Sequence, residues 1–249
     1  MQNDGNHMKT SISHRWPLLL TFLGLAVLPA SGGAAPRTPD LIWVHPRFDS
    51  LGVQSVALLP AASFDKNHRD ESFIETMFAR ALQPAGYRWI TPQVAREKIQ
   101  SAGGDSAVTA LSNVILKTGR VDSLSAQRVC STLRTSALMS VRLDQFEQTQ
   151  VEWNQSGKPT TTVRLRAALV DSTGRLLWSA SGSETGEGQY HEADAGMTGV
   201  SGSGLNTTPT TAQGGAPSFE DVTTRLLDRW MKRFPARPAT ATSVVPAKP

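Results

Sequence analysis

Hydrophobic residues recur along the chain with two different spacings, and the changes between them predict an alternation of strands and helices. Residues 55–60 form a short apolar run that ends in proline, as a buried strand often does. Between residues 70 and 82 the large apolar side chains recur every three or four positions, which predicts an amphipathic helix. Residues 87–90 then predict a second short strand.

Three further helical segments are predicted between the second strand and residue 133. The first begins at the Thr91-Pro92 pair, because proline is favoured at the first helical position, and is expected to reach residue 100. A pair of glycines at 103–104 interrupts the pattern. Residues 105–119 and 125–133 then each carry their apolar side chains on one face, which predicts two more helices.

A period of two begins near residue 136 and predicts three antiparallel strands in succession. The strands are expected at residues 138–146, 163–170 and 176–180. Between the second and third of them, the sequence from Asp171 to Gly174 has the composition of a tight hairpin turn. The three strands therefore form a meander.

This order of elements predicts a single layered α/β domain, in which a mixed, mostly antiparallel sheet carries helices packed chiefly on one face. The domain is expected to span residues 54–235 and to end in an amphipathic helix that Ser218 caps. A flexible insertion rich in Gly, Thr and Ser is expected at 184–217. A lead segment at 35–53, with a short apolar edge segment, precedes the domain, and a disordered tail at 236–249 follows it.

The first 34 residues have the organisation of a secretory signal peptide. Lys9 and Arg15 precede a mostly apolar run at 17–28, and small residues follow it. That run is shorter than the roughly 20 residues that a membrane-spanning helix needs. Cleavage after Ala34 is expected, so the sequence predicts an exported periplasmic protein, with peripheral association with the outer membrane left open.

Composition and charge narrow the class of partner. Among 249 residues there are 25 basic and 21 acidic side chains, which gives a formal net charge of +4. This small surplus is spread through the chain, so nucleic acid is not an expected partner. The single cysteine, Cys130, lies in an apolar helical pattern and is expected to be a buried core residue.

Several segments resemble the group of bacterial envelope lipoproteins related to the TolB amino-terminal domain and to CsgG. They are residues 55–60, 138–146, 169–178 with the sequence LVDSTGRLLW, and 219–235. The resemblance implies the layered fold and an accessory or assembly protein that binds other macromolecules, and it supplies no catalytic residue. This chain departs from the group because no cysteine follows the apolar run, so the lipid anchor is not carried over.

No motif points to catalysis, to a cofactor or to a bound metal. The nearest group of possible metal ligands is His191, Glu192 and Asp194, which falls in the glycine-rich insertion and is interpreted as a solvated loop. Catalytic groups can nevertheless be distant in sequence. An exported hydrolase that acts on cell-wall or outer-membrane material therefore remains the alternative function.

The candidate partner-binding residues are three arginines on the predicted meander and one tryptophan beside its first turn. They are Arg142, Arg164, Arg166 and Trp153. By alternation the arginines share the polar face of neighbouring strands, where they can bind an acidic partner, a lipid headgroup or a glycan. The competing interpretation is a solvated face whose charge Asp144 and Glu147 balance, with Trp153 covering the sheet edge.

The sequence thus predicts an accessory or assembly protein of the cell envelope that acts by binding macromolecules. Its expected partner is an envelope protein or an outer-membrane component. Homo-oligomers that pair an exposed sheet edge are a further possibility, because edge strands readily pair with other chains.

Overall fold

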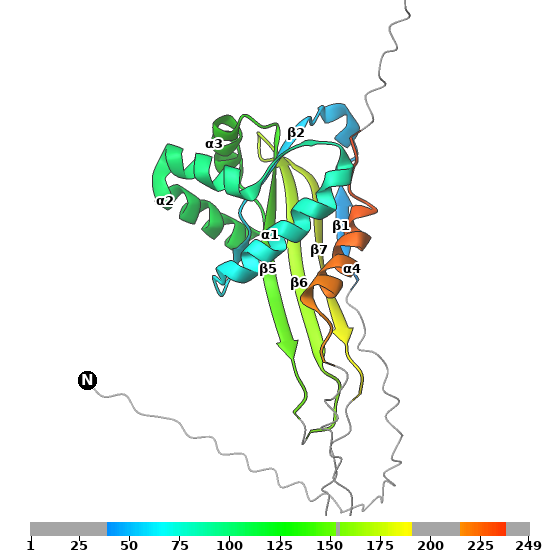
Figure 1. The fold of residues 1–249 in the computed structure, drawn as a ribbon. Helices are drawn as coiled ribbons and strands as arrows, with labels where there is room; N and C mark the ends of the chain where they lie inside the picture. The colour runs from blue at the N-terminus through cyan, green and yellow to red at the C-terminus, as the bar shows by residue number, and fades with distance from the viewer. Residues whose placement is uncertain (1–38, 153–154, 191–214, 238–249) are drawn as a thin grey trace, which may run out of the picture. The chain divides into compact units, whose positions relative to one another are not determined.

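The structure is a computed structural model, and it describes residues 39–152, 155–190 and 215–237. In these ranges seven strands form one sheet, with the order β1-β7-β6-β5-β2-β4 and with β3 paired to β5 (Figure 1). Four α-helices pack against the sheet. The predicted fold class, a layered α/β domain with a mixed and mostly antiparallel sheet, is confirmed.

The centre of the sheet is the predicted meander. The strands are β1 (Leu41–Val44), β2 (Ser55–Leu58), β3 (Ala62–Ser63), β4 (Arg88–Ile90), β5 (Ala137–Thr149), β6 (Thr160–Asp171) and β7 (Leu176–Glu187). β5, β6 and β7 pair antiparallel in sequence order, and β1 adds antiparallel to β7. β2 is parallel to both β4 and β5, and β3 is parallel to β5. Gly174, with φ of 80°, makes the turn between β6 and β7.

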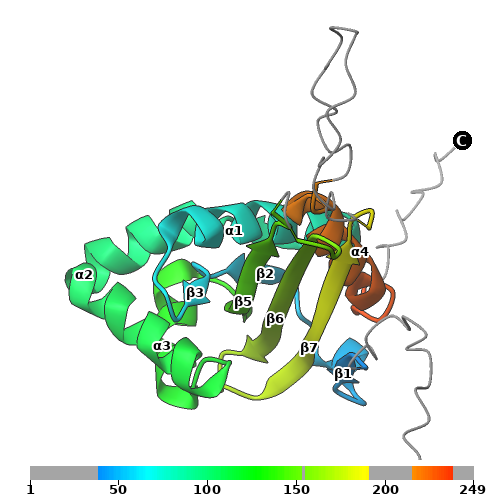
Figure 2. The same cartoon turned by 90° about the horizontal axis from the view of Figure 1, so that it is seen from below.

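The helices divide between the two faces of the sheet. They are α1 (His68–Leu82), α2 (Pro92–Thr118), α3 (Ser123–Leu133) and α4 (Phe219–Met231), with short 3-10 turns at Phe48–Leu51 and Gln83–Ala85. α1 and α4 cover one face, and their apolar residues join the sheet in one core (Figure 2). α2 and α3 form a second core with β2 and β5 on the opposite face.

β2 belongs to both cores, which explains its uninterrupted apolar sequence. Val56 and Leu58 pack in the core with α1 and α4, whereas Ala57 packs in the core with α2 and α3. All three are at most 2% exposed. Trp178 and Trp230 are also fully buried, as their positions in apolar patterns predict.

Local signals in the sequence set the helix boundaries. The side chains of Thr91 and Ser218 accept hydrogen bonds from backbone N–H groups at the starts of α2 and α4, as predicted. The predicted break at the glycine pair is a kink inside α2, where Gly104 has a φ of 70° that only glycine adopts easily. α1 begins slightly earlier than its apolar pattern, because Asn67 caps it.

Two predicted boundaries of the domain are corrected by the sheet. The lead segment 35–53 contributes β1, so the domain begins before residue 54. β7 runs to Glu187, so the first residues of the expected insertion 184–217 are strand residues, and Glu184 is only 1% exposed. These residues are small or polar, and their burial depends on α4 covering them, which no local pattern reveals. The expected signal peptide, most of the insertion and the tail from 238 lie outside the described residues.

Candidate functional site

One part of the sheet carries no described helix. On the side of α2 and α3, these helices contact β2, β3 and β5, whereas the helix that contacts β6 and β7 is α4 on the other side. The uncovered part consists of β6, β7 and β1, and the strand register places one set of side chains on it. We call it the open face, and its residues are Leu41, Trp43, Arg164, Arg166, Ser179 and Ser181.

Arg142 lies beside the open face but is buried. It is directly opposite Arg166 in the β5–β6 ladder, and its relative exposure is 7%. Its Nε donates to Oδ1 of Asp144 at 2.6 Å, and its Nη1 donates to the carbonyl of Leu116 in α2 at 2.8 Å. The ring of Phe64 lies over the guanidinium, 5.4 Å from its carbon to the ring centroid. Arg142 therefore joins the sheet to α2.

Asp144 is shared between two of the predicted arginines. Its Oδ2 accepts a hydrogen bond from Nε of Arg166 at 2.9 Å, while Oδ1 binds Arg142. The ladder register shifts between Leu143 and Gln145, so Asp144 has no opposite residue on β6. One carboxylate thus balances two guanidinium groups, which leaves an excess positive charge here, and the side chain of Arg166 remains 54% exposed.

Two arginines at this side of the molecule have no acidic partner among the described residues. Arg164 is exposed and lies between Gln145 and Ser183 in the sheet register. Arg120 is exposed and directly follows the end of α2. Glu147 also lies on this side, but its carboxylate accepts a hydrogen bond from Gln145 at 2.9 Å and makes no ion pair in the described part of the chain.

A shallow groove of about 460 Å³ crosses the open face between β1 and the end of α2. Its floor is made of small residues of β6 and β7, which leave space above the sheet. The side chains that matter most are Arg120 and Arg166 near α2, Ser179 and Ser181 on the floor, and Leu41 and Trp43 on β1. The ring of Trp43 contacts His45 edge-on at 5.9 Å and is 42% exposed.

The structure therefore brings together Arg166, Arg164 and the buried Arg142, as alternation predicts. Trp153 lies outside the described residues. Sequence reasoning missed Leu41, Trp43 and Arg120. The first two are alternating apolar residues in the lead segment and are a recognisable edge-strand pattern, but only the pairing of β1 with β7 places them beside the arginines.

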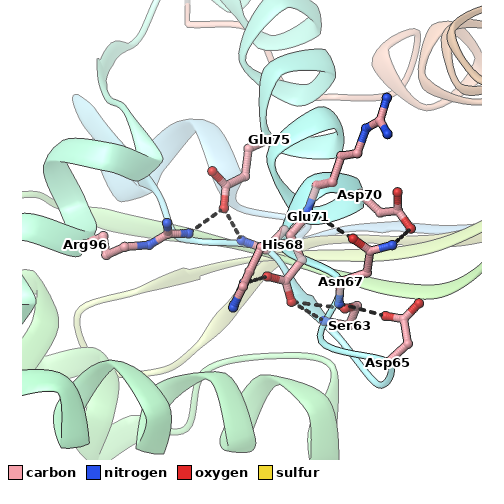
Figure 3. A network of polar contacts seen from close by, with 10 residues as sticks. Ser63, Asp65, Asn67, His68, Asp70, Glu71, Glu75 and Arg96 are labelled. Carbon is pink, nitrogen blue, oxygen red and sulfur yellow. Dashed lines mark hydrogen bonds and ion pairs between the residues drawn. The ribbon is translucent and has the colours of Figure 1, made fainter.

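A second polar cluster surrounds the start of α1 and includes a serine, a histidine and a carboxylate (Figure 3). The Oε1 atom of Glu71 accepts from the backbone N and Oγ of Ser63 at 3.1 and 3.0 Å. Its Oε2 atom contacts Nδ1 of His68 at 2.9 Å. In a hydrolase triad the histidine lies between the serine and the carboxylate, whereas here Glu71 lies in the middle. Ser63 is also 1% exposed, so this cluster fixes β3 to α1.

Glu75 continues this cluster one turn further along α1. Its Oε1 accepts from the backbone N of Ala61 at 2.9 Å and from Nη2 of Arg96 at 3.1 Å (Figure 3). Burial of the carboxylate raises the pKa of Glu75 above the ordinary value of 4.5, although these two donors oppose the shift. Glu75 thus connects α1 to α2 and to the loop after β2.

A third polar cluster lies under α4 on the covered face. Arg229 donates from Nε to Asp40 at 2.7 Å, and it also binds Glu184, which Arg225 approaches as well. The hydrogen bond to Asp40 is the first cause that raises the pKa of Arg229. Gly182 leaves the space that Asp40 fills, because a Cβ there would lie 2.0 Å from its Oδ1. This cluster connects the segment before β1 to β7 and α4.

Other chemistry was sought across the described ranges. They contain no group of three or more His, Cys, Asp or Glu side chains placed to hold a metal ion. In the same ranges no helix is both long and apolar enough to cross a membrane. Cys130 is buried as predicted, and burial raises the pKa of its thiol to about 11, so the thiol is protonated at neutral pH.

Comparison with known proteins gives weak similarities. No family model matches the sequence, and no curated protein matches it. Among solved structures, the lipoprotein GNA1162 from Neisseria meningitidis is 22% identical over 54% of this chain and 83% of that chain, with a TM-score of 0.41. The PelC dodecamer from Paraburkholderia phytofirmans is 14% identical over 64% of this chain and 84% of that chain, with a TM-score of 0.35.

A third similar structure is the C-terminal domain of LpoB from Salmonella enterica. It is 15% identical over 53% of this chain and 82% of that chain, with a TM-score of 0.32. Bacterial lipoproteins are thus among the similar structures. The more specific resemblance to the TolB and CsgG group stays a prediction.

Proposed function

We propose that this protein is an exported accessory protein of the bacterial cell envelope that binds another macromolecule through the open face. The observation that carries the proposal is the combination of exposed Trp43 and Leu41 with the unpaired Arg120 and Arg164 on the one part of the sheet that no described helix covers. The pattern of a secretory signal peptide in the first 34 residues supports export.

The side chains of the open face favour an acidic partner. Guanidinium groups form strong, directed hydrogen bonds with carboxylates and phosphates, and an exposed tryptophan offers a large apolar surface. Here four guanidinium groups, those of Arg120, Arg142, Arg164 and Arg166, lie near only two carboxylates, Asp144 and Glu147. An acidic surface of an envelope protein or of an outer-membrane component fits this excess of positive charge.

No arrangement of the described residues favours the hydrolase alternative. The serine, histidine and carboxylate that the fold brings together are linked in an order that does not activate Ser63, and Ser63 is buried. The proposal is therefore limited to binding.

Photo-crosslinking in cells tests the proposal. A photoreactive amino acid at Ser181, opposite Arg166 on the open face, is expected to give a defined adduct. The adduct should fall at least tenfold when Arg120 and Arg164 are both changed to Ala. The matched control is the same group at Val94, which is 39% exposed in the first turn of α2. Equal adducts from both positions, or an adduct that ignores the arginines, would contradict the proposal.

Export is tested separately. Fractionation of cells and determination of the mature N-terminus are expected to find the chain in the periplasm without its first 34 residues. A cytosolic protein that keeps these residues would refute the location but not the binding surface.

A further inference from the structure

We infer that β1 is a self-pairing edge, through which two copies of this chain join antiparallel with Trp43 of one copy directly opposite Trp43 of the other. The inference is independent of the partner proposed for the open face.

The outer edge of β1 is unusually apolar for an exposed strand. Leu41 is 71% exposed, Trp43 is 42% exposed and Val44 is 38% exposed. β1 ends the sheet, and no described strand pairs with its outer side. Soluble proteins commonly protect such an edge with lysine, proline or a bulge, and β1 contains none of these. A concentration of apolar side chains on an unprotected edge indicates an interaction surface.

The hydrogen bonds to β7 determine which backbone groups of β1 are available. The backbone N of His45 donates to the carbonyl of Leu177 at 2.8 Å. In an antiparallel ladder the hydrogen-bonded residues alternate, so Trp43 and Leu41 also direct their backbone groups toward β7. The N–H and C=O groups of Ile42 and Val44 therefore point outward, where they can form a second ladder.

This alternation selects one register for two identical strands. Ile42 of one copy pairs with Val44 of the other, so that the outward N–H and C=O groups of both are satisfied. The two-fold axis then passes between the two Trp43 residues. They occupy a non-hydrogen-bonded position, where opposite Cα atoms are about 4.5 Å apart and side chains are closest.

A second copy fits this edge better than a strand of another composition. Both faces of the pair would bring apolar side chains together: Trp43 against Trp43 on one face, and Ile42 against Val44 on the other. The charges flanking β1 also favour the antiparallel direction, because Asp40 precedes the strand and Arg47 follows it. Two antiparallel copies place these unlike charges at the same end, whereas a parallel pair would place like charges together.

The resulting dimer is a closed, isologous pair with one continuous sheet. A two-fold axis perpendicular to the sheet leaves the open faces of both copies on the same side. The surface proposed for the acidic partner would thereby be doubled.

Disulfide trapping tests the register in the full exported protein with Cys130→Ser. Trp43→Cys is expected to form a covalent dimer under mild oxidation at least ten times faster than Leu41→Cys. Leu41 is the more exposed residue, so random collisions would favour it. In the inferred register the two Leu41 residues are about 14 Å apart, too far for a disulfide. Equal or faster trapping at Leu41 would overturn the register.

Light scattering tests the dimer itself. The wild-type protein is expected to be dimeric at micromolar concentration, and Trp43→Arg to be monomeric because it places two like charges opposite each other. Val44→Pro removes an outward N–H donor and should also give a monomer, since proline is tolerated on the free side of an edge strand. A monomeric wild type, or a Trp43→Arg variant that remains dimeric, would overturn the inference.

Discussion

Arg142 and Arg164 show how two arginines of the same meander acquire different roles. Both lie on the polar side of their strands, but only Arg142 is covered, by α2 and by the ring of Phe64. Covering a charge removes it from water, and its partner groups must then replace the lost hydration. Asp144 and the carbonyl of Leu116 do so for Arg142, whereas Arg164 keeps its hydration. The first is therefore a residue of stability and the second a residue of binding.

Substitution by alanine is expected to separate these roles. Arg142→Ala should lower the free energy of unfolding by about 3 kcal/mol, because it leaves a buried carboxylate and a buried carbonyl with fewer donors. Arg164→Ala should change that free energy by less than about 0.5 kcal/mol, as exposed substitutions do. Urea denaturation of both variants provides the measurement. A loss of stability in Arg164→Ala that equals the loss in Arg142→Ala would contradict the assignment.

Glu75 makes the stability depend on pH in a direction that follows from its burial. Its pKa is raised in the folded protein, so the unfolded chain releases this proton first as the pH rises from 4.5. The contribution of Glu75 to stability is therefore largest below that pH and is lost as the pH rises through the raised value. Glu75→Gln keeps an oxygen that can accept from Ala61 but does not ionise.

The expected result is that Glu75→Gln becomes more stable relative to the wild type as the pH rises above 4.5, until the difference becomes constant. Unfolding curves at a series of pH values give this difference. Glu97→Gln, at an exposed position of α2, is the control and should show no such rise. A difference that falls over the same range would mean that the Arg96 ion pair outweighs burial.

At the scale of elements, local pattern predicts those strands and helices whose burial is set by their own sequence. The meander has a period of two, and α4 has a cap and an apolar stripe, so both were predictable. The end of β7 was not, because Glu184 and Gly186 are buried by α4, a segment distant in sequence. Their small size is what allows the helix to approach.

The candidate site divides in the same way. Alternation predicts that Arg164 and Arg166 share a face, since both belong to one strand. The burial of Arg142 and the bulge at Asp144 depend on where α2 and β6 come to lie. The position of Trp43 depends on the pairing of β1 with β7. A single sequence contains no direct signal for these long-range pairings.

Gly182 illustrates how an element of small residues holds the N-terminal part of the sheet. Gly182→Ala should destabilise the protein by about 1–3 kcal/mol, because its Cβ would occupy the position of Asp40 and separate it from Arg229. Gly157→Ala is the matched control, since its Cβ would lie 3.5 Å from Val151, an ordinary contact. Thermal unfolding of both variants gives the comparison, and equal melting temperatures would contradict this role of Gly182.

At the scale of the whole molecule, the two cores are expected to unfold together. They share β2 and β5, whose alternate residues pack on opposite faces, so neither core can open without exposing a strand of the other. Each core has its own probe. Trp178 and Trp230 lie in the core with α1 and α4, and Cys130 lies in the core with α2 and α3.

These probes allow a direct test in a Trp43→Phe background, which removes the exposed tryptophan of β1. In the native protein the thiol should resist alkylation at neutral pH, because it is buried and its pKa is about 11. As urea is added, the reactivity of Cys130 and the change in tryptophan fluorescence should have the same midpoint. Reactivity that appears at a lower urea concentration would show that α2 and α3 detach first, and that the shared strands do not couple the two cores.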